Sequence, residues 1–310
     1  MIQVANLRKD FGDFTAVDGI NFSIDRDSGI TALLGPNGAG KTTTMRLITG
    51  YLEPTDGQIA INNTPITDDA SRVEMQRHIG YLPESTPLYP EMLVSEYLAF
   101  MGQVRGLATN ELSKRAAEMI EALELGSHLY SPLGILSKGF RQRAALAATL
   151  IHNPDVIILD EPTSGLDPNQ IIHIRSIIKN LGSKATVVLS THILQEVEDI
   201  CDRVIIINRG RIVADESAHV LRNIGVNQCR ISVRGENVAA TLEKLPLVTS
   251  CRAVEQDMDD QPEGYTLYEC ELTESAPEKL FRELAQLNWE VRELAPATRS
   301  LQEVFQEFTR

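Results

Sequence analysis

A glycine-rich segment near the N-terminus has the residue types and the spacing that bind phosphate groups. Residues 35–43 read Gly-Pro-Asn-Gly-Ala-Gly-Lys-Thr-Thr and fit the pattern G-x-x-x-x-G-K-[ST]. The segment follows an apolar run and opens a helical pattern, which is the context that this motif requires. Glycines let successive backbone N–H groups turn toward phosphate oxygens, and the start of a helix favours negative charge. The predicted phosphate loop comprises Gly35, Pro36, Asn37, Gly38, Ala39, Gly40, Lys41, Thr42 and Thr43.

Two kinds of side chain complete the chemistry that this loop predicts. The Lys41 ammonium can reach the β- and γ-phosphates of a nucleotide, and the Thr42 hydroxyl can hold Mg²⁺. A second acidic element follows the apolar run 156–159, where the chain continues with Asp160 and Glu161. A carboxylate at a strand end beside a phosphate loop suits a Mg²⁺ water, which is the role predicted for Asp160, and Glu161 is placed to polarise an attacking water. A strand that ends in Asp-Glu is weak evidence alone, but it is strong evidence beside a phosphate loop.

Residues 1–216 contain the elements that must position this site. Short β-rich runs alternate there with helical patterns, which is typical of an α/β fold. Apolar runs without polar alternation predict strands buried on both faces of a parallel sheet. These runs lie at residues 29–34, 156–160, 186–190 and 203–208. Between about residues 88 and 152 the pattern becomes helical, with apolar residues at i, i+3, i+4 and i+7 from Val94. We expect a helical subdomain inserted into this first domain.

The composition changes after Asp215-Glu216, which predicts a second domain of residues 217–310. Its patterns read β-α-β-β-α-β, the order of a small α+β, ferredoxin-like unit. Strands are expected near 228–234, 249–257, 264–273 and 289–295, helices near 236–245 and 276–287, and a short terminal helix at 300–308. The acidic residues 257–260 are expected at the tip of a hairpin.

Composition limits the classes of function. The chain has 310 residues, 29 Lys+Arg against 43 Asp+Glu and a formal charge of −14, which disfavours a generic nucleic-acid binder. No apolar run approaches the roughly 18 residues of a membrane span, and the N-terminus lacks the pattern of a secretory signal. We therefore expect a soluble, cytoplasmic chain. The four cysteines form no C-x-x-C pair and are expected to be buried, reduced thiols, with metal binding or redox chemistry as the alternative; they are Cys201, Cys229, Cys251 and Cys270.

Further segments occur in an order and spacing that point to one family. They are 136–143 (L-S-K-G-F-R-Q-R), 164–167 (S-G-L-D), 190–192 (S-T-H), 81–84 (Y-L-P-E) and the aromatic residue Phe11. Together with the phosphate loop and the acidic strand end, they make residues 1–216 resemble the ATP-binding subunit of an ABC (ATP-binding cassette) transporter. The resemblance implies the fold of a P-loop NTPase cassette, with ATP and Mg²⁺ as its ligands.

The resemblance also implies roles for single residues in the nucleotide site. His192 matches the switch histidine, which senses the γ-phosphate; in isolation this residue would be an ordinary surface histidine. Phe11 matches the aromatic residue that stacks on adenine, and Val17 is assigned to the same nucleotide site. Glu84 stands where the family has a glutamine, and it is assigned to the metal because glutamate keeps an oxygen for Mg²⁺ or its water.

In this family two cassettes pair head to tail, with two ATP molecules between them. The resemblance therefore assigns Ser137, Gly139 and Asp167 to the nucleotide interface of a homodimer, or of a heterodimer with a related cassette. Lys138 and Phe140 depart from the usual signature L-S-G-G-Q, whereas Ser137 and Gly139 keep it. These departures resemble a bacterial subgroup, the gliding-motility and multidrug export type, which carries an appended C-terminal domain.

The resulting hypothesis is an ATPase subunit that drives an export-type membrane permease. It would lie at the cytoplasmic face of the inner membrane, where segment 81–90 and the helical subdomain would receive a permease helix. The alternative is a soluble ABC ATPase that acts on nucleic acid or ribosomes. Repair types carry a long coiled coil before the signature and translation types carry two cassettes, and this sequence has neither. A regulatory cassette without turnover is disfavoured because both Glu161 and His192 are present.

Overall fold

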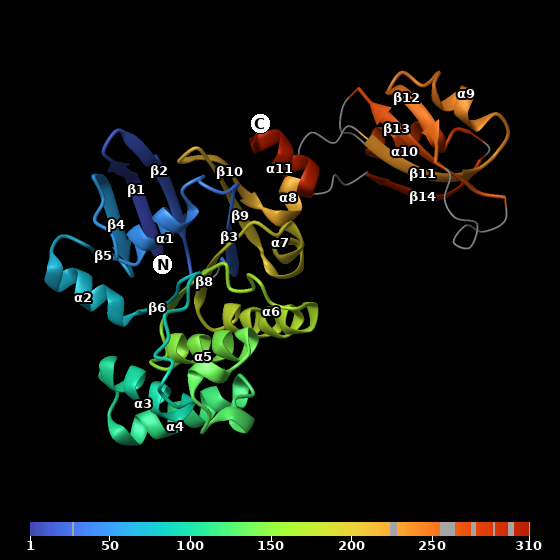
Figure 1. Ribbon diagram of the computed structural model, residues 1–310. Helices are drawn as coiled ribbons and strands as arrows, with labels where there is room; N and C mark the ends of the chain where they lie inside the picture. Colours follow the sequence, from blue (N-terminus) through green and yellow to red (C-terminus); the bar gives the residue numbers. More distant parts are fainter. Residues whose placement is uncertain are drawn as a thin grey trace. The chain divides into compact units, whose positions relative to one another are not determined.

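The computed structural model divides the chain into two compact units (Figure 1). The first contains residues 1–218 together with 305–310, and the second contains residues 219–304. The residues that the structure describes are 1–26, 28–223, 228–254, 264–273, 277–287, 289–296 and 301–309. The acidic tip predicted at 257–260 lies outside these described residues.

The first unit is built on a six-stranded sheet with the order β10-β9-β3-β8-β7-β6. Neighbours from β9 to β6 are parallel, and β10 is antiparallel to β9. Their bounds are β3 (Ile30–Leu34), β6 (Ile79–Leu82), β7 (Val156–Asp160), β8 (Thr186–Thr191), β9 (Arg203–Asn208) and β10 (Arg211–Ser217). Every residue of β3, β7 and β8 is buried, as expected for apolar strands covered on both faces. The predicted α/β class is confirmed.

A second sheet in this unit is antiparallel and was not predicted from the sequence. Its order is β2-β1-β4-β5, with bounds β1 (Ile2–Phe11), β2 (Phe14–Ile24), β4 (Asp56–Ile61) and β5 (Thr64–Pro65). Strands β1 and β4 lie far apart in the sequence, so local patterns do not indicate that they pair. The apolar residues of this sheet share one core with the six-stranded sheet: Ile2, Ile24 and Ile59 belong to the same buried cluster as Leu33 and Val156.

Helices of the first unit occupy two regions. The green helices α3, α4 and α5 gather together, away from the antiparallel sheet (Figure 1), and they lie within residues 88–152, where a helical subdomain is predicted. The others contact strands: α1 contacts β2 and β7, α2 contacts β6, and α6 and α7 contact β8. The bounds are α1 (Lys41–Ile48), α2 (Asp69–Arg77), α3 (Val94–Val104), α4 (Thr109–Ala122), α5 (Lys138–Leu150), α6 (Pro168–Gly182) and α7 (Leu194–Ile200), with short 3₁₀ turns at Gly126–His128 and Leu133–Ile135.

The second unit contains one antiparallel sheet with the order β12-β13-β11-β14. Its elements follow one another as β-α-β-β-α-β: β11 (Gln228–Arg234), α9 (Val238–Leu242), β12 (Val248–Ala253), β13 (Thr266–Leu272), α10 (Pro277–Leu284) and β14 (Glu290–Pro296). Apolar residues of the helices, such as Leu242 and Leu280, form a separate core with Ile231 and Val233 of the central strand β11.

Two helices contain residues of both units: α8 (Ala218–Asn223) and α11 (Leu301–Thr309). The last residues of α11 cluster with the first unit, whereas the sequence grouped all of 217–310 in one domain. A hydrogen bond contributes to this difference, because the Asn208 side-chain amide donates to the Phe308 carbonyl at 3.3 Å.

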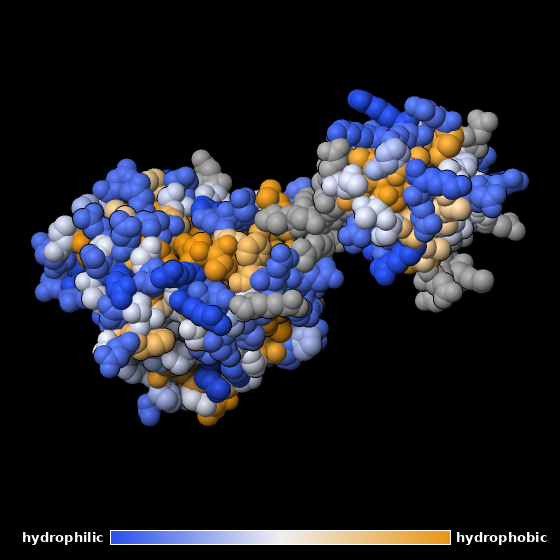
Figure 2. All heavy atoms as spheres, turned by 90° about the horizontal axis from the view of Figure 1, so that it is seen from above, coloured by the Kyte–Doolittle hydropathy of each residue, from blue (hydrophilic) through white to orange (hydrophobic). Residues whose placement is uncertain are grey.

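Hydrophilic side chains cover most of the face seen in Figure 2, and hydrophobic ones are visible in patches on both units. Strands β1, β2 and β10 each leave one large apolar side chain exposed: Phe11, Phe14 and Val213. Within the described part of the chain, no helix has the length and apolarity that crossing a bilayer requires.

The separate core of the second unit predicts that this unit folds alone. Residues 219–304, expressed without the rest of the chain, should unfold cooperatively on heating, because their buried apolar cluster lies wholly within this range. The fragment should not bind ATP. Circular dichroism during a thermal scan checks the first point, and a gradual, uncooperative loss of signal would contradict it.

Candidate functional site

Three parallel strands bring the predicted motifs to one edge of the central sheet. Strand β8 lies between β3 and β7, with Leu34 opposite Thr191 and Asp160 opposite Ser190. The phosphate loop follows β3, Glu161 follows β7 and His192 follows β8. Because parallel strands end at the same edge of a sheet, segments that are far apart in the sequence meet there.

A pocket of about 540 Å³ lies at this edge. Most of its lining was predicted from the motifs: Asn37, Gly38, Gly40, Lys41, Thr42, Thr43, Glu84, Glu161 and His192. Sequence reasoning missed Phe14 and Ala16, which also line the pocket, and it named the segment 164–167 without assigning Ser164 to this site. Phe14 and Ala16 come from the antiparallel sheet, whose position next to the phosphate loop has no local signal in the sequence.

The phosphate loop has a backbone that requires glycine at its last position. Gly40 has φ of 107°, and a Cβ there would lie 2.5 Å from the Ala16 carbonyl oxygen. Helix α1 begins at the next residue, Lys41, so its first N–H groups face the pocket side of the loop. The loop residues Gly35, Pro36 and Ala39 are buried or half-buried and contribute backbone to this turn.

Lys41 is buried beneath the loop. Its ammonium donates hydrogen bonds to the carbonyl oxygens of Gly35 at 2.7 Å and Pro36 at 3.2 Å. Burial lowers the pKa of Lys41, and the negative charges of Glu161, Asp160 and Glu84 act against this by favouring the charged form. Three carboxylates therefore face one ammonium, which leaves the site able to take a further positive charge.

Asp160 carries the most confined carboxylate of the site, since the residue is only 1% exposed. Its Oδ1 accepts hydrogen bonds from the hydroxyls of Thr42, at 3.3 Å, and Ser190. Its Oδ2 is buried without a hydrogen-bond partner among the described residues. An unpaired buried carboxylate oxygen is costly, so this atom fits a ligand of positive charge beside Thr42. Asp160 also acts on the half-buried Tyr81: burial, with this nearby negative charge, raises the pKa of the Tyr81 hydroxyl to about 12.

Glu161 and His192 lie together at the mouth of the pocket. His192 Nδ1 is 3.0 Å from Glu161 Oε1, and the histidine side chain is half exposed. The Glu161 backbone N–H donates to the Ser190 hydroxyl at 3.1 Å, and the residue has a φ of 48°, in the left-handed region. Hydrogen bonds thus fix the backbone of Glu161 and connect its carboxylate to His192, and both residues line the pocket.

A buried carboxylate behind the pocket, Glu196 on α7, was not singled out from the sequence. It is 1% exposed and accepts hydrogen bonds from Thr191 Oγ1, at 2.6 Å, and from Thr163 Oγ1. Arg175 lies 3.8 Å away. Thr191 precedes His192, and Thr163 lies in the segment after Glu161, so Glu196 connects the two segments that enter the pocket from β7 and β8.

The remaining predicted residues do not line this pocket. Phe11 is half exposed beside Lys9, whose Nζ lies 5.4 Å from the ring centre. The side chain of Val17 was assigned to the nucleotide, but the structure buries it in the core at 1% exposure, because alternate residues of a strand face opposite sides. Ser137 and Asp167 cap helices α5 and α6, where they accept from backbone N–H groups at 3.3 and 3.0 Å.

Gly139 lies where α5 and α6 come together. A Cβ at this position would lie 2.4 Å from the side-chain Cδ of Gln170 on α6. Nearby, the Lys138 ammonium lies against Gly165, whose φ of 68° also favours glycine. The structure therefore brings the signature segment beside the segment 164–167, whose first residue, Ser164, lines the pocket that holds the phosphate loop.

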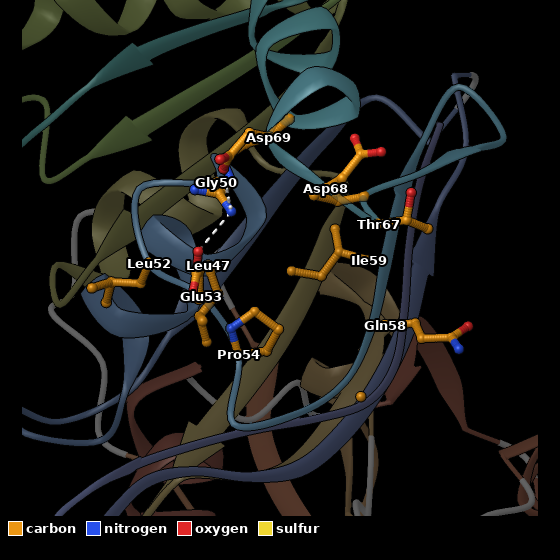
Figure 3. Close-up of a pocket in the computed structure, with 13 residues that line it drawn as sticks. Leu47, Gly50, Leu52, Glu53, Pro54, Gln58, Ile59, Thr67, Asp68 and Asp69 are labelled. Carbon is orange, nitrogen blue, oxygen red and sulfur yellow. Dashed lines mark hydrogen bonds and ion pairs between the residues drawn. The ribbon is translucent and has the colours of Figure 1, made fainter.

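A different hollow, of about 490 Å³, lies between α1, α2 and β4 (Figure 3). Ile59 points into it and the acidic Asp68 lies at its rim, while Arg72 forms an ion pair with Glu53 at 2.7 Å. None of the predicted motif residues lines this hollow, so the pocket at the sheet edge is the candidate site.

Comparisons with known proteins agree with this geometry. Residues 17–164 match the family model described as ABC transporter. The linearmycin resistance ATP-binding protein LnrL of Bacillus subtilis is 37% identical over 215 residues, which cover 69% of this chain and 68% of that protein. The Nod factor export ATP-binding protein I of Ralstonia nicotianae is 36% identical over 241 residues, covering 77% and 74%. A solved dimeric structure of a bacterial ABC transporter cassette, MJ0796, superposes with a TM-score of 0.65 at 27% identity, covering 70% of this chain and 98% of that one.

The contacts of Glu196 generate a prediction about stability. Replacing Glu196 with Ala should lower the free energy of unfolding by about 3 kcal/mol, because two buried hydroxyls would lose their acceptor. Urea denaturation followed by circular dichroism measures this. The control is Gln195→Ala, on the same helix but exposed, which should change the value by less than about 0.5 kcal/mol. Equal effects of the two substitutions would refute the bridging role.

Proposed function

Because the chain belongs to the ATP-binding proteins of ABC transporters, we propose that it binds and hydrolyses ATP and thereby drives an export-type membrane permease. One observation carries the proposal: the Lys41 ammonium lies near the carboxylates of Asp160 and Glu161, where adjacent parallel strands end beside the pocket. A phosphate loop, a confined carboxylate and a carboxylate at the mouth are the parts that phosphoryl transfer to water requires.

Nucleotide binding rests on the phosphate loop and Lys41. The N–H groups at the start of α1 would donate to phosphate oxygens. The Lys41 ammonium now donates to two carbonyl oxygens of the loop, and it would exchange part of this bonding for the β- and γ-phosphates. The ring of Phe14, which lines the pocket, supports a stacking position for the base; the family's stacking residue, Phe11, remains the other candidate.

A Mg²⁺ ion fits the oxygen atoms beside Lys41. Thr42 Oγ1 and Asp160 lie next to each other, and Asp160 Oδ2 has no hydrogen-bond partner in the described chain. Glu84 lines the same pocket and would add a third oxygen ligand. The bound ion would supply positive charge against the phosphate oxygens. Hydroxyl and carboxylate oxygens of this kind are the ligands that Mg²⁺ prefers.

Glu161 is the proposed general base. Its carboxylate would accept a proton from the attacking water as the oxygen of that water approaches the γ-phosphorus. His192, 3.0 Å from the same carboxylate, would hold the side chain in position and face the γ-phosphate from the end of β8. Glu196 would act one step further away, by fixing Thr191 and Thr163 on either side of this pair.

A second cassette would complete the site. Ser137, Gly139 and Asp167 lie outside the pocket of their own chain, at the starts of α5 and α6. The start of α5 offers a serine hydroxyl and the N–H groups of a first helical turn, which are suitable donors for a γ-phosphate. The dimeric form of the related cassette supports a pairing in which these residues face the nucleotide of the partner. ATP would then hold two cassettes together until hydrolysis.

Coupling to a permease is supported by a groove next to the helical subdomain. The α2–α3 groove, about 600 Å³, is lined by residues that include Tyr51, Tyr81, Met101, Val104 and Arg105. Tyr51 is 70% exposed and Val104 62% exposed, so the groove presents apolar surface for a short cytoplasmic helix of a membrane protein. The relative named for Nod factor export favours the export direction. This chain would act at the cytoplasmic face of the membrane.

The base assignment predicts the behaviour of one conservative variant. Glu161→Gln keeps the shape of the side chain but removes the proton acceptor, so ATP hydrolysis should fall by roughly two to four orders of magnitude. ATP binding should persist, because the phosphate loop is intact. With MgATP the variant should sediment as a dimer, since the γ-phosphate is not cleaved. Phosphate release assays and analytical ultracentrifugation measure the two effects.

The matched control is Lys41→Ala, which should lose most of its nucleotide affinity and stay monomeric, because it removes the cation that faces the phosphates. Ordinary hydrolysis by Glu161→Gln would exclude Glu161 as the base. A variant that binds ATP but remains monomeric at high concentration would count against the shared site in the isolated subunit.

The α2–α3 groove predicts an effect on assembly alone. Val104→Glu places a charge in the groove and should abolish co-purification of the tagged chain with an integral-membrane protein of about six apolar spans. Nucleotide affinity should be unchanged. Ile172→Glu is the matched control, since it adds the same charge at a position 65% exposed outside the groove. Loss of the membrane partner in both variants, or in neither, would show that the groove is not the docking site.

A further inference from the structure

Two cysteines of the second unit face each other across neighbouring strands. Cys251 on β12 lies directly opposite Cys270 on β13, and their sulfur atoms are 3.0 Å apart. Both thiols are free. Cys270 is fully buried, whereas Cys251 is partly exposed on β12, which stands at one end of the sheet's strand order (Figure 1). A reagent in solvent can therefore reach the sulfur of Cys251, whereas the sulfur of Cys270 is buried next to it.

Polar pairs on both sides hold the two cysteines in this register. Ser250 donates to the Glu271 carboxylate at 3.1 Å, and Arg252 forms an ion pair with Glu269 at 2.7 Å. Both pairs join β12 to β13, one residue before and one residue after the cysteines. A slip of one residue would break both pairs and separate the sulfurs, so the close approach is built into the strand pairing.

The two thiols differ in reactivity. The hydrogen bond from the Cys270 thiol lowers the pKa of Cys251, because it stabilises the thiolate. The same contact, together with burial, raises the pKa of Cys270. The Cys251 sulfur is thus the better nucleophile, and the Cys270 thiol stays protonated until it attacks Cys251.

We propose that Cys251 and Cys270 form a reactive dithiol site, which a small-molecule disulfide such as oxidised glutathione converts into an intramolecular disulfide. The Cys251 thiolate attacks one sulfur of the reagent, and the other sulfur leaves as a thiolate with the bonding electrons. Cys270 then gives up its proton and attacks Cys251 Sγ, which releases the second small thiol. Two protein thiols are oxidised, and one reagent disulfide is reduced to two thiols.

The step order can be tested on the full-length chain with oxidised glutathione as the probe. After native incubation and acid quenching, thiol titration should fall from four free cysteines to two. The intact mass should drop by that of two hydrogen atoms, and peptide mapping should join residue 251 to residue 270. Dithiothreitol should restore all four thiols.

Single substitutions separate the two roles. Cys270→Ser should stop at the mixed disulfide and gain the mass of one glutathione, whereas Cys251→Ser should keep its three thiols. Cys229→Ser is the matched control: Cys229 is buried on β11 and faces Cys270 from the other side, so this variant should still lose two thiols. Four thiols retained by the wild type would overturn the proposal. So would protection by Cys229→Ser in place of Cys251→Ser, which would assign the disulfide to Cys229 and Cys270.

Discussion

Parallel pairing of β3, β8 and β7 is the constraint on which the rest of the site depends. The register aligns Leu34 with Thr191 and Asp160 with Ser190, so three strand ends lie side by side. Every residue of these strands is buried, and the apolar core thereby fixes where the chain emerges. A shift of one residue would exchange the side chains between the two covered faces of the sheet and would separate Asp160 from Ser190 and Thr42. The electrostatics of the pocket are therefore a consequence of sheet packing.

Much of this centre could be predicted because its signals are local. The phosphate loop, the acidic strand end and the apolar runs each lie within a few adjacent residues. The strands predicted at 156–160 and 203–208 have the same bounds in the structure. The parts that were missed depend on contacts between distant segments. Phe14 and Ala16 line the pocket because the antiparallel sheet places them there. The role of Glu196 depends on hydrogen bonds from Thr163 and Thr191, which only the folded chain brings close to it. Val17 was assigned to the nucleotide site, but the sequence alone does not tell which side of its strand faces the pocket.

The residues that depart from the family pattern each have a structural explanation. Glu84 is exposed and lines the pocket, so it adds negative charge near Lys41 without the cost of burial. Lys138 extends along the backbone of Gly165, where a side chain would have no room. Phe140 stacks on His128, with ring centres 3.9 Å apart. Each unusual side chain has a specific neighbour, and none of them intrudes on the phosphate loop.

The backbone conformation of Glu161 places stability and the proposed catalytic role of this residue in conflict. Its φ of 48° is unfavourable for a residue with a Cβ by about 1 kcal/mol, and glycine would relieve it. Stability alone therefore favours losing the carboxylate that we propose as the general base. Selection for thermal stability without selection for ATP hydrolysis is therefore expected to favour variants that are more stable but have lost the Glu161 carboxylate. Substitutions that stabilise this protein and keep Glu161 would have to lie away from the end of β7.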